Sequence, residues 1–153
     1  MTELALYSGF KLKQSMQPQR DDALLPDLGM AKLRSAPGPE QITLLCLAGC
    51  NGVPHNHNDV GSFIVHKHGN AFLVDPGSPV YRRETFGPRR YEILYCSSKG
   101  HSVPVINGKL QMVGRDFAGI LTVAEAPGQG VKKAAIDMTH AYPRGTVRRF
   151  VRT

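Results

Sequence analysis

Short strand-like segments, separated by turn residues, are the feature that most constrains what this chain can fold into. Apart from a weak signal at its start, no part of the chain shows apolar residues at helical period. Many short strands at regular spacing predict an all-β fold, an antiparallel β-sandwich of the supersandwich kind. The predicted strands are 29–35, 41–48, 61–68, 70–75, 101–106, 109–113, 120–126, 131–138 and 146–152.

The clearest hairpin joins segments 61–68 and 70–75. His68-Gly69-Asn70 supplies residues that tolerate positive φ, which a tight turn requires. Such a turn places Asp75 opposite about Ser62. Asn107-Gly108 and the stretch from Pro127 to Gly130 indicate two further turns. Residues 76–99, rich in Gly, Pro and charge, are expected to form a long functional loop.

The 153 residues suffice for one domain with a hydrophobic core. Residues 1–25 are polar and irregular, so we expect a linker or residual interdomain segment there and a domain over 26–153. The last predicted strand stops at the chain end without a polar tail, and an exposed strand edge is a liability. We therefore expect an incomplete domain, truncated at its C-terminus and belonging to a larger protein.

The charge balance favours an anionic partner. Nineteen Lys and Arg residues against twelve Asp and Glu residues give a net charge of +7. Such a field suits nucleic acid, acidic polysaccharide or a lipid surface, although a solvated basic surface explains it equally well. Basic residues interleaved with aromatic ones are lacking, which disfavours nucleic acid. No apolar run approaches the roughly 20 residues of a membrane span.

The three cysteines do not indicate a disulfide framework, because their number is odd and their spacing does not repeat. Cys46 and Cys50 precede the histidine-rich stretch at a spacing that resembles a zinc finger. However, Cys46 lies inside the apolar segment 41–48, where a buried free thiol is the commoner state. Ligation of a metal by cysteine is therefore disfavoured.

The chain concentrates its polar chemistry at His55, His57 and Asp59, in a loop of Pro, Gly and Asn. Imidazole and carboxylate are the usual ligands of zinc. H-x-H-x-D is compatible with metallo-β-lactamase-like hydrolases, but Val60 stands where their next histidine belongs. A cupin is the second alternative, but no Glu follows at the expected distance. His66, His68 and His140 are expected to be hydrogen-bonded bystanders.

A third interpretation rests on more of the sequence. Several motifs together resemble the C-terminal β-sandwich domain of the heparinase II/III-like polysaccharide lyases, over about residues 26–152. The motifs are Leu25-Pro26-Asp27-Leu28-Gly29 with Leu33-Arg34-Ser35, His55-x-His57 with Gly61-Ser62-Phe63 and Asp75-Pro76-Gly77, Tyr81, Ser97-Ser98-Lys99-Gly100-His101-Ser102, Val105-Ile106-Asn107-Gly108 with Gln111, and Asp137-Met138-Thr139 with Ala141-Tyr142.

The resemblance implies a single structural zinc ion bound by His57, Asp75 and His101. These residues are far apart in the sequence. An extended segment from His55 to Ser62 would leave His57 too far along the strand from Asp75. The ligand set therefore requires the 55–59 segment to fold back as a loop over the strand end.

The resemblance also implies β-elimination on a polysaccharide that contains uronic acid, such as a glycosaminoglycan or alginate. It places His55 toward the substrate cleft as a catalytic residue, and Tyr81, Arg89 and Arg90 are candidates to contact sugar carboxylates or sulfates. For these last residues, surface or loop-packing roles are equally compatible with the sequence. Where the family has an HNT-type block, this chain has His101-Ser102-Val103, so a specific substrate cannot be carried over.

The family's main acid and base lie on an N-terminal α-helical toroid, which this chain lacks. We therefore expect the isolated chain to be inactive and to need the toroid domain as a partner. A non-catalytic module that binds acidic glycans is the main alternative. The resemblance points to a periplasmic or extracellular protein, and the first residues have no pattern of a signal peptide.

Overall fold

The computed structural model describes residues 22–67, 70–78, 80–126 and 130–153. The predicted turns at His68-Gly69 and at residues 127–129 lie outside these ranges, as do residues 1–21 of the expected linker. Residues 23–25 of that segment form a strand, and the predicted domain boundary at residue 26 stays a prediction.

Five strands form the first sheet, in the order β1-β2-β3-β4-β5, and each pairs antiparallel with its neighbour. Its central strands are the apolar and alternating segments of the sequence, which suit a pleated, half-buried surface. Gly29 (φ 63°) allows the tight turn between β1 and β2. The strands are β1 (Ala23–Leu25), β2 (Met30–Arg34), β3 (Ile42–Leu47), β4 (Phe63–Lys67) and β5 (Asn70–Leu73).

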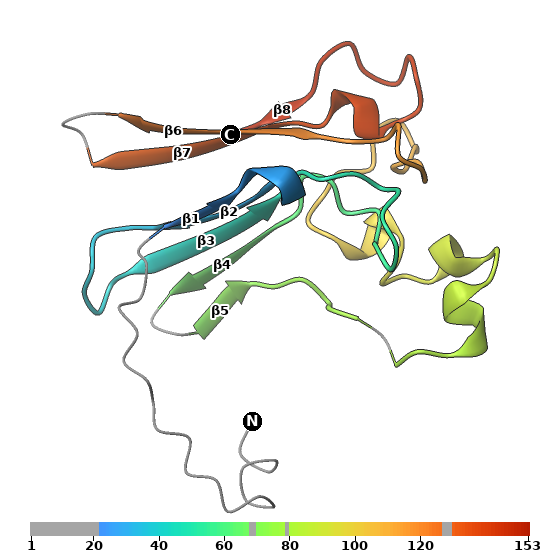
Figure 1. Ribbon diagram of the computed structural model, residues 1–153, viewed down its shortest axis with the longest axis horizontal. Helices are drawn as coiled ribbons and strands as arrows, with labels where there is room; N and C mark the ends of the chain where they lie inside the picture. Colours follow the sequence, from blue (N-terminus) through green and yellow to red (C-terminus); the bar gives the residue numbers. More distant parts are fainter. Residues whose placement is uncertain (1–21, 68–69, 79, 127–129) are drawn as a thin grey trace, which may run out of the picture.

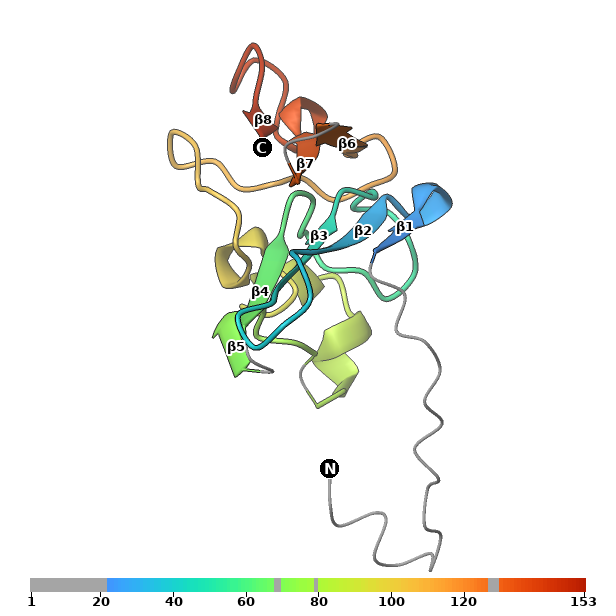
Figure 2. The same cartoon turned by 90° about the vertical axis from the view of Figure 1, so that its left-hand side faces the viewer.

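The second sheet has three antiparallel strands, in the order β6-β7-β8. Its strands are β6 (Ile120–Ala126), β7 (Val131–Asp137) and β8 (Val151–Arg152). Figure 1 shows this sheet, in orange and red, lying over the blue and green strands of the first, and Figure 2 shows the same two layers after a quarter turn.

The hydrophobic core lies between the two sheets. Buried residues of the first sheet meet buried residues of β7 and of the turn that follows it. Tyr142, only 1% exposed, donates a hydrogen bond from its hydroxyl to the carbonyl of Pro104 at 2.7 Å. The predicted all-β sandwich is confirmed, and the described helices are all short 3₁₀ turns. The core residues are Ala31, Cys46, Ala48, Val60, Ile136, Met138, Ala141 and Tyr142.

Two predicted strands, 101–106 and 109–113, are wrong. Asn107 and Gly108 do make the predicted turn, with positive φ at both, but a single bridge between Ile106 and Lys109 is all the pairing that results. The backbone beyond it bonds elsewhere, because the N–H of Gln111 donates to Ser98 Oγ. Predicted strand 146–152 is likewise reduced to β8.

The hairpin of β4 and β5 was predicted to place Asp75 opposite about Ser62, and the two side chains are in contact in the structure. A bulge between Val65 and His66 shifts the pairing, and Val65 then faces Leu73. Ser62 Oγ donates to Asp75 Oδ2 at 3.3 Å. Asp75 therefore lies at the end of the first sheet, beside the loop that carries the histidines.

Residues 76–99, expected as a loop, contain three 3₁₀ helices joined by irregular segments. These helices are η2 (Arg83–Phe86), η3 (Arg90–Glu92) and η4, which extends to residue 100 (Ser98–Gly100). Among the described residues, no helix has the length and apolar character needed to cross a membrane.

Candidate metal centre

The loop between β3 and β4 folds back over the end of the sheet. Gly61 adopts φ 90° and donates its N–H to the carbonyl of Leu47 at 2.7 Å, which turns the chain sharply before β4. Farther out, the N–H of Asn58 donates to the carbonyl of Cys96 at 2.9 Å. These bonds hold the loop against the segment that leads to His101, which is the arrangement that the predicted ligand set required.

Gln111 fixes the inner end of this loop from across the core. Its amide is 4% exposed and makes a reciprocal pair with Val60. The N–H of Val60 donates to Gln111 Oε1 at 3.1 Å, and Gln111 Nε2 donates to the Val60 carbonyl at 2.6 Å. Asn51 Nδ2 donates to the same Oε1 at 3.1 Å. Because Val60 follows Asp59, this network sets where the Asp59 carboxylate lies.

His101 follows η4, and its side chain is fully buried, with both ring nitrogens in contact with oxygen. Nε2 lies 2.9 Å from the carbonyl oxygen of Tyr95, and Nδ1 lies 2.6 Å from Asp75 Oδ2. Because a carbonyl can only accept, Nε2 carries a hydrogen. The short contact at Nδ1 is then a proton shared between the imidazole and the carboxylate.

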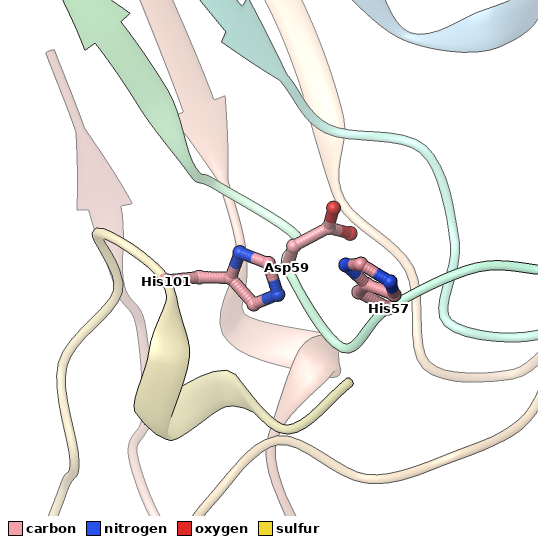
Figure 3. Close-up of side chains that lie close together, drawn as sticks. All are labelled: His57, Asp59 and His101. Carbon is pink, nitrogen blue, oxygen red and sulfur yellow. The ribbon is translucent and has the colours of Figure 1, made fainter. Parts of the chain in front are cut away.

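His57, Asp59 and His101 form a cluster with metal-binding character. One ligand atom from each of the three residues lies within 4.8 Å of the others. Figure 3 shows His57 and Asp59 on the same loop, with His101 approaching from the turn opposite. The rings of His57 and His101 are 5.2 Å apart between centroids. Zinc ligands at about 2.0–2.1 Å from the ion lie at most about 4.2 Å apart, so a small side-chain adjustment would form a shell.

The electrostatics of this cluster favour a cation. Burial raises the pKa of Asp59 to about 6, with the nearby Asp75 carboxylate adding to the effect and His101 opposing it. Burial also lowers the pKa of His57, helped by the charges of His101 and Arg90. Neutral imidazole is the form that binds metal, and a bound cation would compensate the half-buried Asp59 carboxylate.

A second cluster, of three aromatic rings, lies on the outer side of the same loop. The His55 ring is 5.2 Å from the Phe86 ring and 6.2 Å from the Tyr81 ring, and the Tyr81 and Phe86 rings are 5.0 Å apart. All three residues are exposed. His55 has φ 62°, which is uncommon for a residue other than glycine.

The two candidate arginines differ in their surroundings. Arg89 is exposed and pairs with Glu92 through Nη2 at 2.6 Å. Arg90 is 9% exposed and donates to the backbone carbonyls of Thr85 and Asn56, both at 2.6 Å. Arg90 therefore ties the aromatic cluster to the histidine loop. Contact of either arginine with a sugar acid stays a prediction.

Comparison with known protein families shows to which family the chain belongs. The sequence model described as "Heparinase II/III-like, C-terminal" matches residues 17–152. The chain belongs to this heparinase II/III-like family. A search of curated proteins found no match.

Among solved structures, the family fold is seen in the crystal structure of heparinase III. That structure superposes with a TM-score of 0.55 at 19% sequence identity, over 79% of this chain. At that identity the likeness concerns the fold. The match takes in 21% of the heparinase III chain, so this chain spans about a fifth of that protein.

Within this heparinase II/III-like domain, the predicted metal ligands come together only in part. His57 and His101 lie in the cluster of three, whereas Asp75 is not part of that cluster and contacts His101 Nδ1 at 2.6 Å. Asp59, which is not among the ligands predicted from the sequence, takes the third place in that cluster. The position of Asp59, two residues after His57, is a sequence signal that could have indicated a third ligand. No comparable sequence signal marks Phe86, which lies beside His55 in the aromatic cluster.

Proposed function

We propose that this chain is the metal-binding β-sandwich part of a polysaccharide lyase, and that it binds one structural zinc ion through His57, Asp75 and His101. The observation that carries the proposal is the position of His101. Its Nδ1 lies 2.6 Å from Asp75 Oδ2, and its ring centroid lies 5.2 Å from that of His57, at the point where the loop and the sheet end meet.

The surroundings of His101 support Nδ1 as the ligand atom. A histidine that binds metal through one nitrogen commonly donates its other N–H to a carbonyl or carboxylate, which fixes the tautomer. Here Nε2–H donates to the Tyr95 carbonyl, so the lone pair of Nδ1 faces Asp75. A zinc ion in place of the shared proton would join His101 and Asp75 and supply folding energy to the loop.

Asp59 is the competing carboxylate. It belongs with His57 and His101 in the cluster of three. Desolvation raises its pKa, so a bound cation would stabilise its charged form. In that arrangement His101 would bind the ion through Nε2, giving up its bond to the Tyr95 carbonyl, and its Nδ1–H would donate to the Asp75 carboxylate outside the shell. The two ligand sets share both histidines and differ in one carboxylate, so they can be separated by experiment.

We expect Asp75→Asn to lose about one equivalent of zinc, because it removes a charged ligand. Asp59→Asn should keep that zinc with an affinity reduced by about 10–100-fold, the usual cost of losing an outer-shell partner. Elemental analysis and a competition titration with a chelator measure both quantities. Asp116→Asn, at an exposed carboxylate outside the cluster, is the matched control. Zinc lost from Asp59→Asn but kept in Asp75→Asn would assign the ligand role to Asp59.

The proposed reaction is β-elimination on a polysaccharide that contains uronic acid. A base removes the proton at C5, the neighbouring carboxylate is neutralised, and the bond to the 4-oxygen breaks as an acid protonates that oxygen. From this chain, His55 would contribute an exposed imidazole that faces the substrate. The principal base and acid would come from an α-helical toroid domain.

The alternative is a module that binds acidic glycans without chemistry, favoured by the net charge of +7. We would join the chain to a helical toroid domain of the same family and follow the absorbance of unsaturated uronate. The lyase proposal expects product from the joined protein, little from either part alone, and reduced turnover with full zinc content for His55→Ala. Glycan binding without product in every combination would favour the binding module.

A further inference from the structure

Arg152 reaches the surroundings of the candidate metal centre from the second sheet. It lies opposite Ile136 in the pairing of β8 with β7. Residues that pair across two strands place their side chains on the same face of the sheet. Ile136 is 2% exposed and belongs to the core between the sheets, so the side chain of Arg152 also points toward the first sheet. Figure 2 shows β8 on the side of the second sheet nearer to β4.

The guanidinium of Arg152 bonds to both segments that carry the candidate ligands. Its Nη1 donates to the carbonyl of Gly61, two residues after Asp59, at 2.5 Å. The same nitrogen donates to the carbonyl of Ser102, the residue after His101, at 2.5 Å. One nitrogen atom therefore joins the end of the histidine loop to the segment that carries the most buried ligand.

The environment of Arg152 is unusual for a cation. Its carbon Cζ lies 4.9 Å from the centre of the ring of Phe63, the first residue of β4. Burial lowers the pKa of Arg152, because the charged form is partly removed from water. Its described hydrogen-bond partners are two neutral carbonyls. Hydrogen bonds from a charged donor are roughly twice as strong as neutral ones, so these two bonds offset the desolvation and hold both carbonyls firmly.

We propose that Arg152 is a positioning residue for the candidate metal centre, and that it acts by clamping the loop of His57 to the segment of His101. The second sheet thereby fixes the separation of two ligands that are far apart in the sequence. The inference rests on the proposed zinc site, and it holds with either carboxylate as the third ligand, because both ligand sets contain the two histidines. The clamp joins backbone groups, so it acts in the zinc-free chain as well.

The test measures zinc affinity and, separately, the rigidity of the zinc-free chain. Arg152→Met keeps an apolar stem against Phe63 but removes the hydrogen-bond donors. We expect it to weaken zinc binding about tenfold in a competition titration with a chelator, the usual scale for a residue outside the ligand shell. Arg152→Lys should bind zinc within about threefold of the wild type, because an ammonium group can also donate to two carbonyls.

Hydrogen exchange followed by NMR in the zinc-free chain reports on the clamp itself. The N–H of Asn58 donates to the carbonyl of Cys96, and the N–H of Val103 donates to the carbonyl of His101. These two amides lie on the two clamped segments. In Arg152→Met we expect both to exchange about tenfold faster than in the wild type, because local opening becomes easier.

Two further variants separate positioning from general stability. Arg148→Met, at an exposed arginine of the same segment, should match the wild type in both measurements. Leu33→Ala, at a buried position on β2, lowers the stability of the fold without touching the clamp. Under conditions where it remains folded, Leu33→Ala should bind zinc within about twofold of the wild type, and urea unfolding confirms that its stability has fallen.

Zinc affinity and amide exchange in Arg152→Met that equal those of Arg148→Met would overturn the clamp. An equal loss of affinity in Leu33→Ala would assign the effect to stability and overturn the positioning role, and Arg152→Lys no better than Arg152→Met would overturn the two carbonyl bonds as its basis. A wild-type chain that binds no zinc would contradict the proposed metal site and with it the positioning role, whatever the exchange rates show.

Discussion

His101→Ala is expected to abolish zinc binding and to lower the melting temperature by roughly 10 °C in the presence of excess zinc. A ligand at about a thousand times its dissociation constant stabilises a protein by about 4 kcal/mol, and each kcal/mol shifts a domain of this size by about 2–4 °C. His101 also bonds Asp75 and the Tyr95 carbonyl, so its removal takes away the shortest hydrogen bond of a half-buried carboxylate.

Differential scanning calorimetry with and without a chelator measures this effect and separates its two causes. When the chelator removes zinc, the melting temperature of the wild-type chain should fall most of the way to that of His101→Ala. The melting temperature of His101→Ala should not respond to the chelator. His140→Ala, at an exposed histidine beyond β7, should behave as the wild type. A His101→Ala chain that still carries one equivalent of zinc would contradict the proposed site.

Gln111→Leu is expected to cost about 2–4 kcal/mol in the free energy of unfolding, although leucine has nearly the same volume. The amide of Gln111 satisfies both backbone groups of Val60 and accepts from Asn51, all of them buried. Leucine would leave the Val60 N–H and carbonyl without partners, and each orphaned buried group costs about 1–3 kcal/mol. Since Val60 anchors the loop that carries His57, zinc affinity should fall as well.

Urea unfolding of the zinc-free chain measures the loss of stability without the contribution of the metal. The comparison is Gln41→Leu, whose side chain makes a single 3.4 Å contact with the Ser35 carbonyl and should change the free energy by less than about 0.5 kcal/mol. If Gln111→Leu unfolds at the wild-type urea concentration, Gln111 does not hold the loop.

The sequence predicts the sheets well, because the alternation and the apolar runs that mark a strand are local patterns. The strand over 41–48 and the hairpin that ends at Asp75 follow from apolar pattern and turn residues, and so does the approach of Asp75 to Ser62. The failure at 101–113 has a specific cause. A pattern of apolar residues cannot reveal that the backbone N–H of Gln111 pairs with a serine hydroxyl instead of a neighbouring strand.

The sequence predicts which types of residue form the site, but not which carboxylate lies beside the two histidines. The H-x-H pair and the resemblance pointed to His57 and His101, which the structure brings together. Whether Asp59 or Asp75 faces them depends on how the loop folds back, and that depends on long-range bonds such as the one between Val60 and Gln111. The burial of Arg90 is likewise a tertiary property that a run of charged residues does not disclose.

The most direct test of the central claim is a crystal structure of the zinc-loaded chain with anomalous data at the zinc edge. We predict one peak at the sheet end, at about 2.0–2.1 Å from a nitrogen of His57, from Nδ1 of His101 and from an oxygen of Asp75. No peak there, with His101 Nδ1 still in direct contact with Asp75 Oδ2, would contradict the account.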